Sequence, residues 1–364
     1  MKPYLSNNVL DKIPKTSSID DLKTKAEEEF TKYYGTYPTC AVYAPGSLTI
    51  GGKNRNVESK SLSMAVQLVT VVVGKRSHGN KWCYVKTMAE EIVGSKVFDI
   101  YLNTESLEIS TEESLWVRYV KGTIQSFKTR RANVPGFKIV IASNVPMKRG
   151  LGSSSALVVA LYTFLEAITN TYTGNILEKT LACYLAERLA ANPCRVHLGD
   201  ILTSIIGIED KIFCFNPKSL HFKTYNWDSK DVYFIFIECG KKEWSPFCTE
   251  MKNKEMLTLI NTRSKWRTHP LPDSMIQLLF SQETIKMVND INIENDRIKN
   301  MIEKIESEEW EHLGKLMGEN HRPMGECISE LKNVEGVLGI SIIDRDYDAS
   351  IVTLVKRKFF KRKK

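Results

Sequence analysis

Apolar residues recur at helical spacing in four segments of the chain: residues 20–34, 154–168, 177–191 and 198–208. Ser17 and Ser18 precede the first segment as capping candidates, because a serine hydroxyl accepts a hydrogen bond from a free N–H at a helix start. The third segment stops near Asn192-Pro193, since proline cannot continue a helix. From about residue 252 to residue 335 the pattern is again mostly helical.

Short runs rich in β-branched and aromatic residues predict strands. They lie at residues 40–43, 64–73, 137–142, 232–237, 340–343 and 351–355. We expect the first run to end at Pro45-Gly46 and the last two to form a hairpin around Asp344–Asp348. Because the chain is long enough for about two cores and its pattern changes near residues 205–215, we predict two domains, at 1–208 and 209–364.

The net charge of +8 comes almost entirely from one end of the chain. The cations there are Lys356, Arg357, Lys358, Lys361, Arg362, Lys363 and Lys364. Such a cluster is typical of a nuclear-import signal or a nucleic-acid contact, because cations pair with acidic grooves and phosphates. A solvated tail without a partner has the same composition, so both interpretations stay open.

The overall composition, with 42% apolar and 26% charged residues, is that of an ordinary soluble protein. The apolar runs are too short or too interrupted to cross a bilayer, and the N-terminus has no signal pattern. We therefore expect an intracellular protein without a membrane anchor. The eight cysteines are scattered without a C-x-x-C pair, which predicts reduced, mostly buried thiols and no metal site.

The candidate chemistry lies in the segment Pro146-Met-Lys-Arg-Gly-Leu-Gly-Ser-Ser-Ser155, between a predicted strand and a predicted helix. Two glycines permit positive φ and close backbone approach, and the following helix directs free N–H groups and its positive dipole end at the loop. An anion such as the phosphates of a nucleotide fits there. The alternative is a tight strand-to-helix turn capped by serine.

This string resembles the second motif of the GHMP kinases, the family of galactokinases, homoserine kinases and mevalonate kinases, which reads roughly P-x-x-x-G-L-G-S-S-A. The resemblance implies that the triphosphate is bound by Gly150, Leu151, Gly152, Ser153, Ser154 and Ser155. It implies that Ser154, or less surely Ser153 or Ser155, helps to hold magnesium. The implied fold is α/β (α+β), with mixed sheets and packed helices in two domains, the first of which carries the loop.

Further segments resemble galactokinases, in order along the chain: residues 44–46, 63–65, 192–207 and 314–321. The sugar-binding signature departs from that family, where Ala-Pro-Gly is followed by Arg and then by Gly-Glu-His-x-Asp. The matching positions here hold Ser47, Lys53, Asn54 and Asn56. A lysine in place of a carboxylate offers only donors to sugar hydroxyls, so we do not expect galactose as a substrate.

The third family motif is a glycine-rich turn, whereas this chain has Asp344–Asp348 without glycine. Its carboxylates would repel a triphosphate unless magnesium or Arg345 compensates. Asp200 matches the catalytic carboxylate of the family if two extra residues follow Cys194; otherwise Leu198 takes that position. The alternative role of Asp200 is to cap the helix that follows it. His197 and His321 are interpreted as packing residues.

Three hypotheses follow. The first is a non-catalytic regulatory protein of the GHMP kinase fold, similar in kind to a nematode developmental switch of sex determination and X-chromosome dosage compensation. We expect it to act in the nucleus through a protein partner, without a cofactor and without direct binding of nucleic acid. The alternative is an active kinase that uses Mg-ATP on a sugar-like small molecule in the cytoplasm, with Asp200 as its base. A sensor that binds ATP without turnover is the third, weaker possibility.

Overall fold

The computed structural model describes residues 18–52, 59–102, 106–130, 133–191, 196–227, 229–241, 277, 281–318, 331–345 and 348–357. Contacts within the chain define two units. The first contains the described residues up to Leu48 and Ser63–Lys211. The second contains Thr49–Leu62 and the described residues from Ile212 onward. The predicted domain boundary at 208/209 stays a prediction, and the contacts group Thr49–Leu62 with the second unit.

The sheet of the first unit is mixed. Its strands are β1 (Cys40–Gly51), β2 (Ser61–Arg76), β3 (Trp82–Thr87), β4 (Val97–Tyr101) and β5 (Phe137–Ser143). The order is β4-β3-β5-β2, and β1 pairs with β2. β3 pairs with β5 in parallel, while β2 with β5 and β3 with β4 are antiparallel. The sheet therefore has the mixed orientation that was expected from the sequence.

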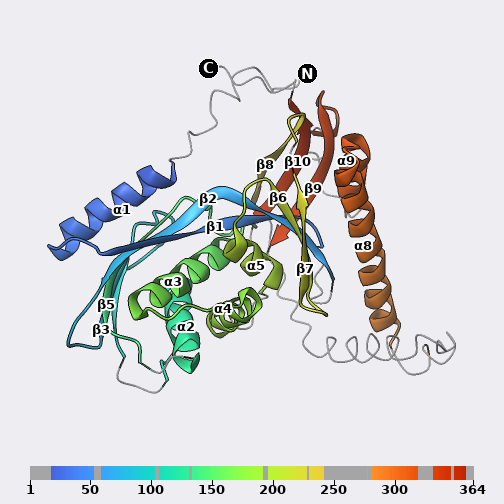
Figure 1. Ribbon diagram of the computed structural model, residues 1–364. Helices are drawn as coiled ribbons and strands as arrows, with labels where there is room; N and C mark the ends of the chain where they lie inside the picture. The colour runs from blue at the N-terminus through green and yellow to red at the C-terminus, as the bar shows by residue number, and fades with distance from the viewer. Residues whose placement is uncertain are drawn as a thin grey trace. The chain divides into compact units, whose positions relative to one another are not determined.

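Both faces of this sheet are covered, because successive strand residues point to opposite sides. Val71, Val73 and Val140 pack on α1 (Ile19–Tyr34), which buries Leu22, Ala26 and Phe30 against them. α1 lies on one side of the strands and α2–α4 lie on the other (Figure 1). α1 begins as predicted, with Ser18 as its cap in a reciprocal capping box with Asp21. Hydrogen bonding of the Asp21 carboxyl with the Ser18 side chain and with the Ser18 backbone N–H holds its pKa below its usual range.

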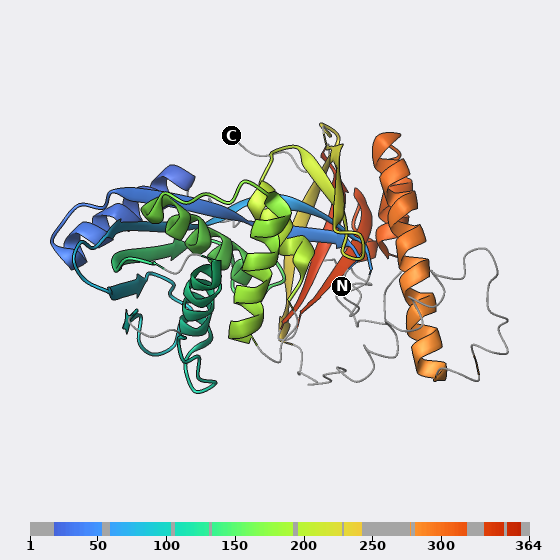
Figure 2. The same ribbon diagram turned by 60° about the horizontal axis from the view of Figure 1, so that its bottom comes forward.

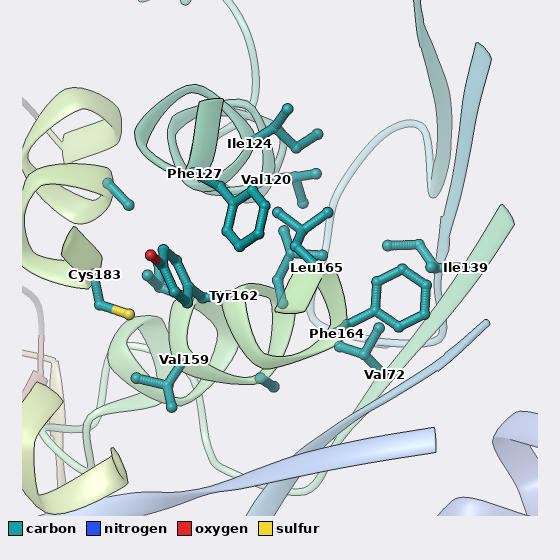
Figure 3. Close-up of a cluster of buried hydrophobic side chains, with 14 of the residues drawn as sticks. Val72, Val120, Ile124, Phe127, Ile139, Val159, Tyr162, Phe164, Leu165 and Cys183 are labelled. Atoms are coloured by element: carbon teal, nitrogen blue, oxygen red, sulfur yellow. The ribbon is translucent and has the colours of Figure 1, made fainter. Parts of the chain in front are cut away.

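The opposite face packs against the helices α2 (Leu115–Arg130), α3 (Ser153–Thr169), α4 (Ile176–Ala191) and α5 (Leu198–Ile206). Aromatic side chains fill the space between them (Figure 3). Phe127 and Tyr162 meet edge-on with ring centroids 5.1 Å apart, and Phe137 meets Phe164 at 5.6 Å. This core packs β5 against α3, the two elements that the glycine loop connects.

The second unit contains β6 (Lys211–Asn216), β7 (His221–Asn226), β8 (Val232–Lys241), α8 (Gln282–Glu306), α9 (Trp310–Gly318), β9 (Val337–Arg345) and β10 (Asp348–Lys356). β8, β10 and β9 form an antiparallel sheet in that order. Asp348 pairs with Arg345, so the predicted hairpin at Asp344–Asp348 is confirmed. The long helix α8 runs beside this sheet in Figure 2.

Backbones approach closely where α9 meets β9. A Cβ atom at Gly314 would lie 2.2 Å from the carbonyl oxygen of Leu338, and one at Gly339 would lie 2.1 Å from the carbonyl oxygen of Gly314. Only two glycines let the helix and the strand touch in this way. The α9 side of the sheet is therefore held by direct contact between main chains.

A buried ion pair connects three segments of the second unit. Glu294 and Arg297 on α8 are 1% and 7% exposed, and their side chains form a bidentate salt bridge. The Gly52 N–H donates to the same glutamate at 2.7 Å, while Arg297 donates to the carbonyl of Leu316 on α9 at 2.5 Å. Both charges are thereby hydrogen-bonded, which is the condition under which buried ions are tolerated.

Some expectations from the sequence were wrong. β1 does not end at Pro45-Gly46 but continues to Gly51. The elements β3, β4, α2, β6 and β7 were not predicted. Predictions about Lys53, Asn54, Asn56, residues 192–194, His321 and the cations Lys358, Lys361, Arg362, Lys363 and Lys364 lie outside the described residues. In the part of the chain that is described, no helix has the length and apolarity to span a bilayer.

Candidate functional site

The glycine loop connects β5 to α3, as predicted. Lys148, Gly150 and Gly152 have φ values of 59°, 78° and 66°, in the left-handed region that glycine adopts without strain. Gly152 itself is the capping residue of α3, and no side chain caps that helix. The tight strand-to-helix turn of that alternative is therefore present, but no serine caps it. The first N–H groups of α3 and the positive end of its dipole have the arrangement that binds anions.

The segment of residues 44–47, where the sugar-binding signature begins, packs directly against this loop. The Ser47 N–H donates to the carbonyl of Leu151 at 2.9 Å, and a Cβ atom at Gly46 would lie 2.6 Å from the same oxygen. The Ser47 hydroxyl is buried, and the structure shows no hydrogen-bond partner for it among the described residues. A buried hydroxyl without a partner is costly, so Ser47 leaves a polar atom available beside the loop.

Two of the loop serines bond to a carboxylate that the sequence analysis missed. Ser154 and Ser155 both donate from their hydroxyls to Glu187 on α4, the second at 3.0 Å. Glu187 is 4% exposed and lies on the buried side of α4 between Ala186 and Ala190. An acid among alanines on the buried face of a helix was the signal that could have identified it, because such acids are rarely buried without a specific partner.

Asp200 is not the N-cap residue of α5. The capping residue of α5 is His197, which makes no side-chain cap, and Asp200 is the third residue of the helix and 1% exposed. The interpretation of Asp200 as an N-cap is therefore wrong. Acids are rarely buried to this extent without a specific partner, which keeps Asp200 a candidate functional residue.

Hydrogen bonds tie the helix of Asp200 to the two strands that carry the other galactokinase-like landmarks. Ser63 on β2 and Thr203 on α5 share a hydrogen bond of 2.7 Å between their hydroxyls. Ser204 donates to the carbonyl of Pro45 on β1, also at 2.7 Å. The structure therefore brings together the segments 44–46 and 63–65 and α5, all of which resemble galactokinases in sequence.

The loop and Glu187 have the donors that a magnesium nucleotide requires. Magnesium takes hard oxygen ligands such as carboxylates, hydroxyls and phosphates, and Glu187 with Ser154 supplies the first two. Ser153 begins α3, and Gly150 and Leu151 complete the turn before it. The residues present therefore fit Mg-ATP. Burial raises the pKa of the Cys183 thiol, which lies one turn before Glu187 on α4, above its usual value.

Two of the seven C-terminal cations take part in the fold. Lys356 pairs with Glu311 at 2.5 Å, and Arg357 donates from its side chain to the carbonyl of Lys230 at 3.2 Å. The Arg357 guanidinium also lies 5.3 Å from the ring centroid of Tyr233. These two residues are the end of β10 and its continuation, so an import signal in this region would rest on the five cations that follow.

Comparisons with known proteins agree with this geometry. Residues 118–207 match the model of the GHMP kinases N terminal domain. Galactokinase from Canis lupus familiaris is 32% identical over 203 residues, which are 55% of this chain and 50% of that protein. The chain thus spans half the length of this relative.

Two solved structures have a similar fold. The Lactococcus lactis galactokinase complexed with galactose has a TM-score of 0.71 at 17% identity and covers 91% of this chain and 89% of its own. The Methanococcus jannaschii mevalonate kinase has a TM-score of 0.59 at 15% identity, with 88% and 91% covered. The chain has the two-domain mixed α/β fold of the GHMP kinases and is galactokinase-like in sequence.

Proposed function

We propose that the chain is an ATP-dependent kinase that phosphorylates a hydroxyl of a small, sugar-like molecule other than galactose. The observation that carries the proposal is the contact of Glu187 with Ser154 and Ser155. A buried acid bonded to two loop hydroxyls is hard to explain as packing, whereas it is an oxygen donor set for magnesium beside a phosphate loop. Similarity to galactokinases supports the same class of reaction.

In the proposed mechanism the N–H groups of the loop bind the phosphates of ATP. Glu187 and Ser154 would hold magnesium, which when bound neutralises charge on the phosphates. Asp200 orients the acceptor hydroxyl and accepts its proton as the oxygen bonds to the terminal phosphorus. The bond between that phosphorus and the bridging oxygen breaks, and ADP leaves.

The residues at the positions of the sugar-binding signature argue for an acceptor other than galactose. Ser47 has no charge and lies buried against the glycine loop, so it contributes a single short hydroxyl where galactokinases have arginine. Lys53, Asn54 and Asn56 replace the charged sugar-binding set in the sequence. A site built from a different set of donors and acceptors rejects galactose, because its own polar groups would be left unpaired.

A second candidate is the non-catalytic regulatory protein, a developmental switch in sex determination and dosage compensation that acts in the nucleus through a protein partner and without a cofactor. The Ser47 hydroxyl is buried and has no partner among the described residues. This supports the second candidate, because a site that has changed its function can keep a polar group whose former partner is lost. The β9–β10 hairpin supports it too, because its sequence at Asp344–Asp348 contains no glycine.

Thermal unfolding with ATP, with magnesium and with both separates the two candidates. A ligand at 100 times its Kd raises the stability by about 2.7 kcal/mol. We expect the wild type to be stabilised by Mg-ATP and the Glu187→Gln variant to lose most of that effect. Glu28→Gln is the control, because Glu28 is an exposed glutamate on another helix, α1.

Turnover is then measured by ADP release over a panel of sugars and polyols. Release with one acceptor, abolished in Asp200→Asn, supports the kinase. If millimolar Mg-ATP leaves the melting temperature of the wild type unchanged, the kinase is excluded and the regulatory candidate remains. Stabilisation without ADP release on any acceptor would indicate a nucleotide sensor.

A further inference from the structure

α4 presents a row of leucines to solvent. Leu181, Leu185 and Leu189 are 43%, 43% and 37% exposed, and Leu177 continues the row one turn earlier at intermediate exposure. Their spacing of four residues places them along one side of the helix. Ile176 at the start of the helix is 42% exposed as well. Single exposed leucines are ordinary, but a continuous row of them marks a contact surface.

The opposite side of α4 is also apolar. Ala182, Cys183, Ala186 and Ala190 are buried there, around Glu187. A surface helix with one buried stripe has polar residues on its other face, and a helix that is apolar on all sides belongs in an interior. α2 packs along one flank of α4, and the two run side by side in Figure 2. The exposed side of α4 therefore carries more leucines than charged residues, with Glu178 and Arg188 lying among them.

The row is symmetric about Cys183, and this symmetry identifies its partner. Reversing the helix exchanges Leu177 with Leu189 and Leu181 with Leu185. The same reversal exchanges Glu178 with Arg188, which are exposed and of opposite charge. A surface that matches its own reverse is complementary to a second copy of itself about a two-fold axis.

We infer that two copies of this chain associate through α4, antiparallel, about a two-fold axis at the level of Cys183. The leucine rows pack as ridges against each other. The Glu178 end of one helix lies beside the Arg188 end of the other. Within the chain Glu178 also pairs with Arg130, and Lys179 with Glu166 at 2.6 Å, so the charges near the row are largely paired before association.

Association through this face would act on the glycine loop. Glu187 is on the inner side of α4, where Ser154 and Ser155 bond to it, and Leu185 is on the outer side. A second copy packed on the outer side restrains the helix that positions the carboxylate. This inference stands without the proposed function, since the row exists whether or not ATP is used.

Sedimentation velocity of the full chain over a range of concentrations tests the dimer. We expect a concentration-dependent shift to the dimer, and at least a tenfold weaker dimer in Leu181→Asp/Leu185→Asp. Ile293→Asp on α8 is the matched control, because Ile293 is an exposed apolar residue of another helix, at 63%. A wild-type chain that stays monomeric at about 100 μM, or a dimer that the double variant leaves unchanged, overturns the inference.

Cysteine crosslinking tests the antiparallel arrangement. A mixture of Leu181→Cys and Leu185→Cys chains should form a disulfide heterodimer on mild oxidation, and wild-type chains under the same conditions should not. Preferential linkage of Leu181→Cys chains to each other would contradict the proposed orientation. Arg188→Glu should weaken the dimer. Adding Glu178→Arg together with Arg130→Glu, which keeps an ion pair at this place within the chain, should restore it, with circular dichroism confirming that each variant is folded. Failure of that restoration would overturn the charge pairing.

Discussion

The side-chain oxygen of Ser47 lies 2.3 Å from the point that a Cβ atom at Gly152 would occupy. Gly152 also has a φ of 66°, so both the space and the backbone at this position require glycine. We predict that Gly152→Ala lowers the free energy of unfolding by about 1–3 kcal/mol. Urea denaturation measures this change, and the stabilisation by Mg-ATP should be lost in the same variant.

The partner variant Ser47→Ala separates the two effects. It removes a buried hydroxyl without a partner in the described structure, so its stability should equal or exceed that of the wild type by up to about 1 kcal/mol. In the double variant the clash disappears and the strain of positive φ remains. If Gly152→Ala is as destabilising in the Ser47→Ala background as in the wild type, the contact with Ser47 is not the cause.

The buried pair of Glu294 and Arg297 gives a prediction for the second unit. Arg297→Met leaves an uncompensated carboxylate, and we expect a loss of about 3–5 kcal/mol. The double variant Glu294→Met/Arg297→Met should recover much of that loss, although Gly52 N–H then lacks its acceptor. Chemical denaturation of the three variants measures these differences. Equal stability of the single and double variants would show that the lone carboxylate is not the source of the loss.

The buried thiol of Cys83 should make the free energy of unfolding depend on pH in the alkaline range. Burial raises the pKa of its thiol to about 12, above the ordinary value of 9.0. Below pH 9 the thiol is protonated in both states, and between pH 9 and 12 only the unfolded state releases its proton. Stability should therefore fall as the pH rises through this window, by at most about 1.4 kcal/mol per pH unit. The slope of unfolding free energy against pH should be smaller in Cys83→Ala, whereas an unchanged slope would exclude Cys83 as its source.

The hydroxyl of Tyr34 links α1 to the sheet by hydrogen bonding. Its hydroxyl lies 3.0 Å from the carbonyl oxygen of Tyr84 and 3.1 Å from that of Ile139, and it donates to them. Burial raises the pKa of this phenol, which keeps it a donor at high pH. We predict that Tyr34→Phe lowers the free energy of unfolding by about 0.5–1.5 kcal/mol. Tyr33→Phe, at an exposed position on the same helix, should change it by less; equal effects would argue against the hydrogen bonds.

The parts of the fold that could be predicted are those with local signatures. Gly150 and Gly152 can adopt positive φ, which makes a tight turn predictable from the sequence. Ser18 and Asp21 have the spacing of a capping box, which is also visible in the sequence. β3 and β4 were missed because polar and aromatic residues such as Trp82, Tyr84 and Tyr101 interrupt their apolar pattern. In the structure these residues line one side of two short strands, with the rings of Trp82 and Tyr101 5.0 Å apart.

The candidate site was predicted only in part, because its parts meet through tertiary contacts. Glu187 lies 33 residues from Ser154, and nothing near either residue in sequence shows that they touch. The burial of Asp200 likewise depends on the packing of α5, which is tied to β1 and β2 through Ser204 and Ser63. A sequence pattern reports which face of a helix is buried, but it does not report what that face meets.

Gly314 and Gly339 limit how this sequence can change over time. A methyl group on either residue would overlap main-chain atoms of the facing segment. Neither position therefore accepts even alanine while α9 and β9 keep their places. A second substitution at the partner cannot compensate, because the obstacle to each is main chain. Among variants that keep this helix on this strand, both positions should remain glycine when the surrounding residues have diverged.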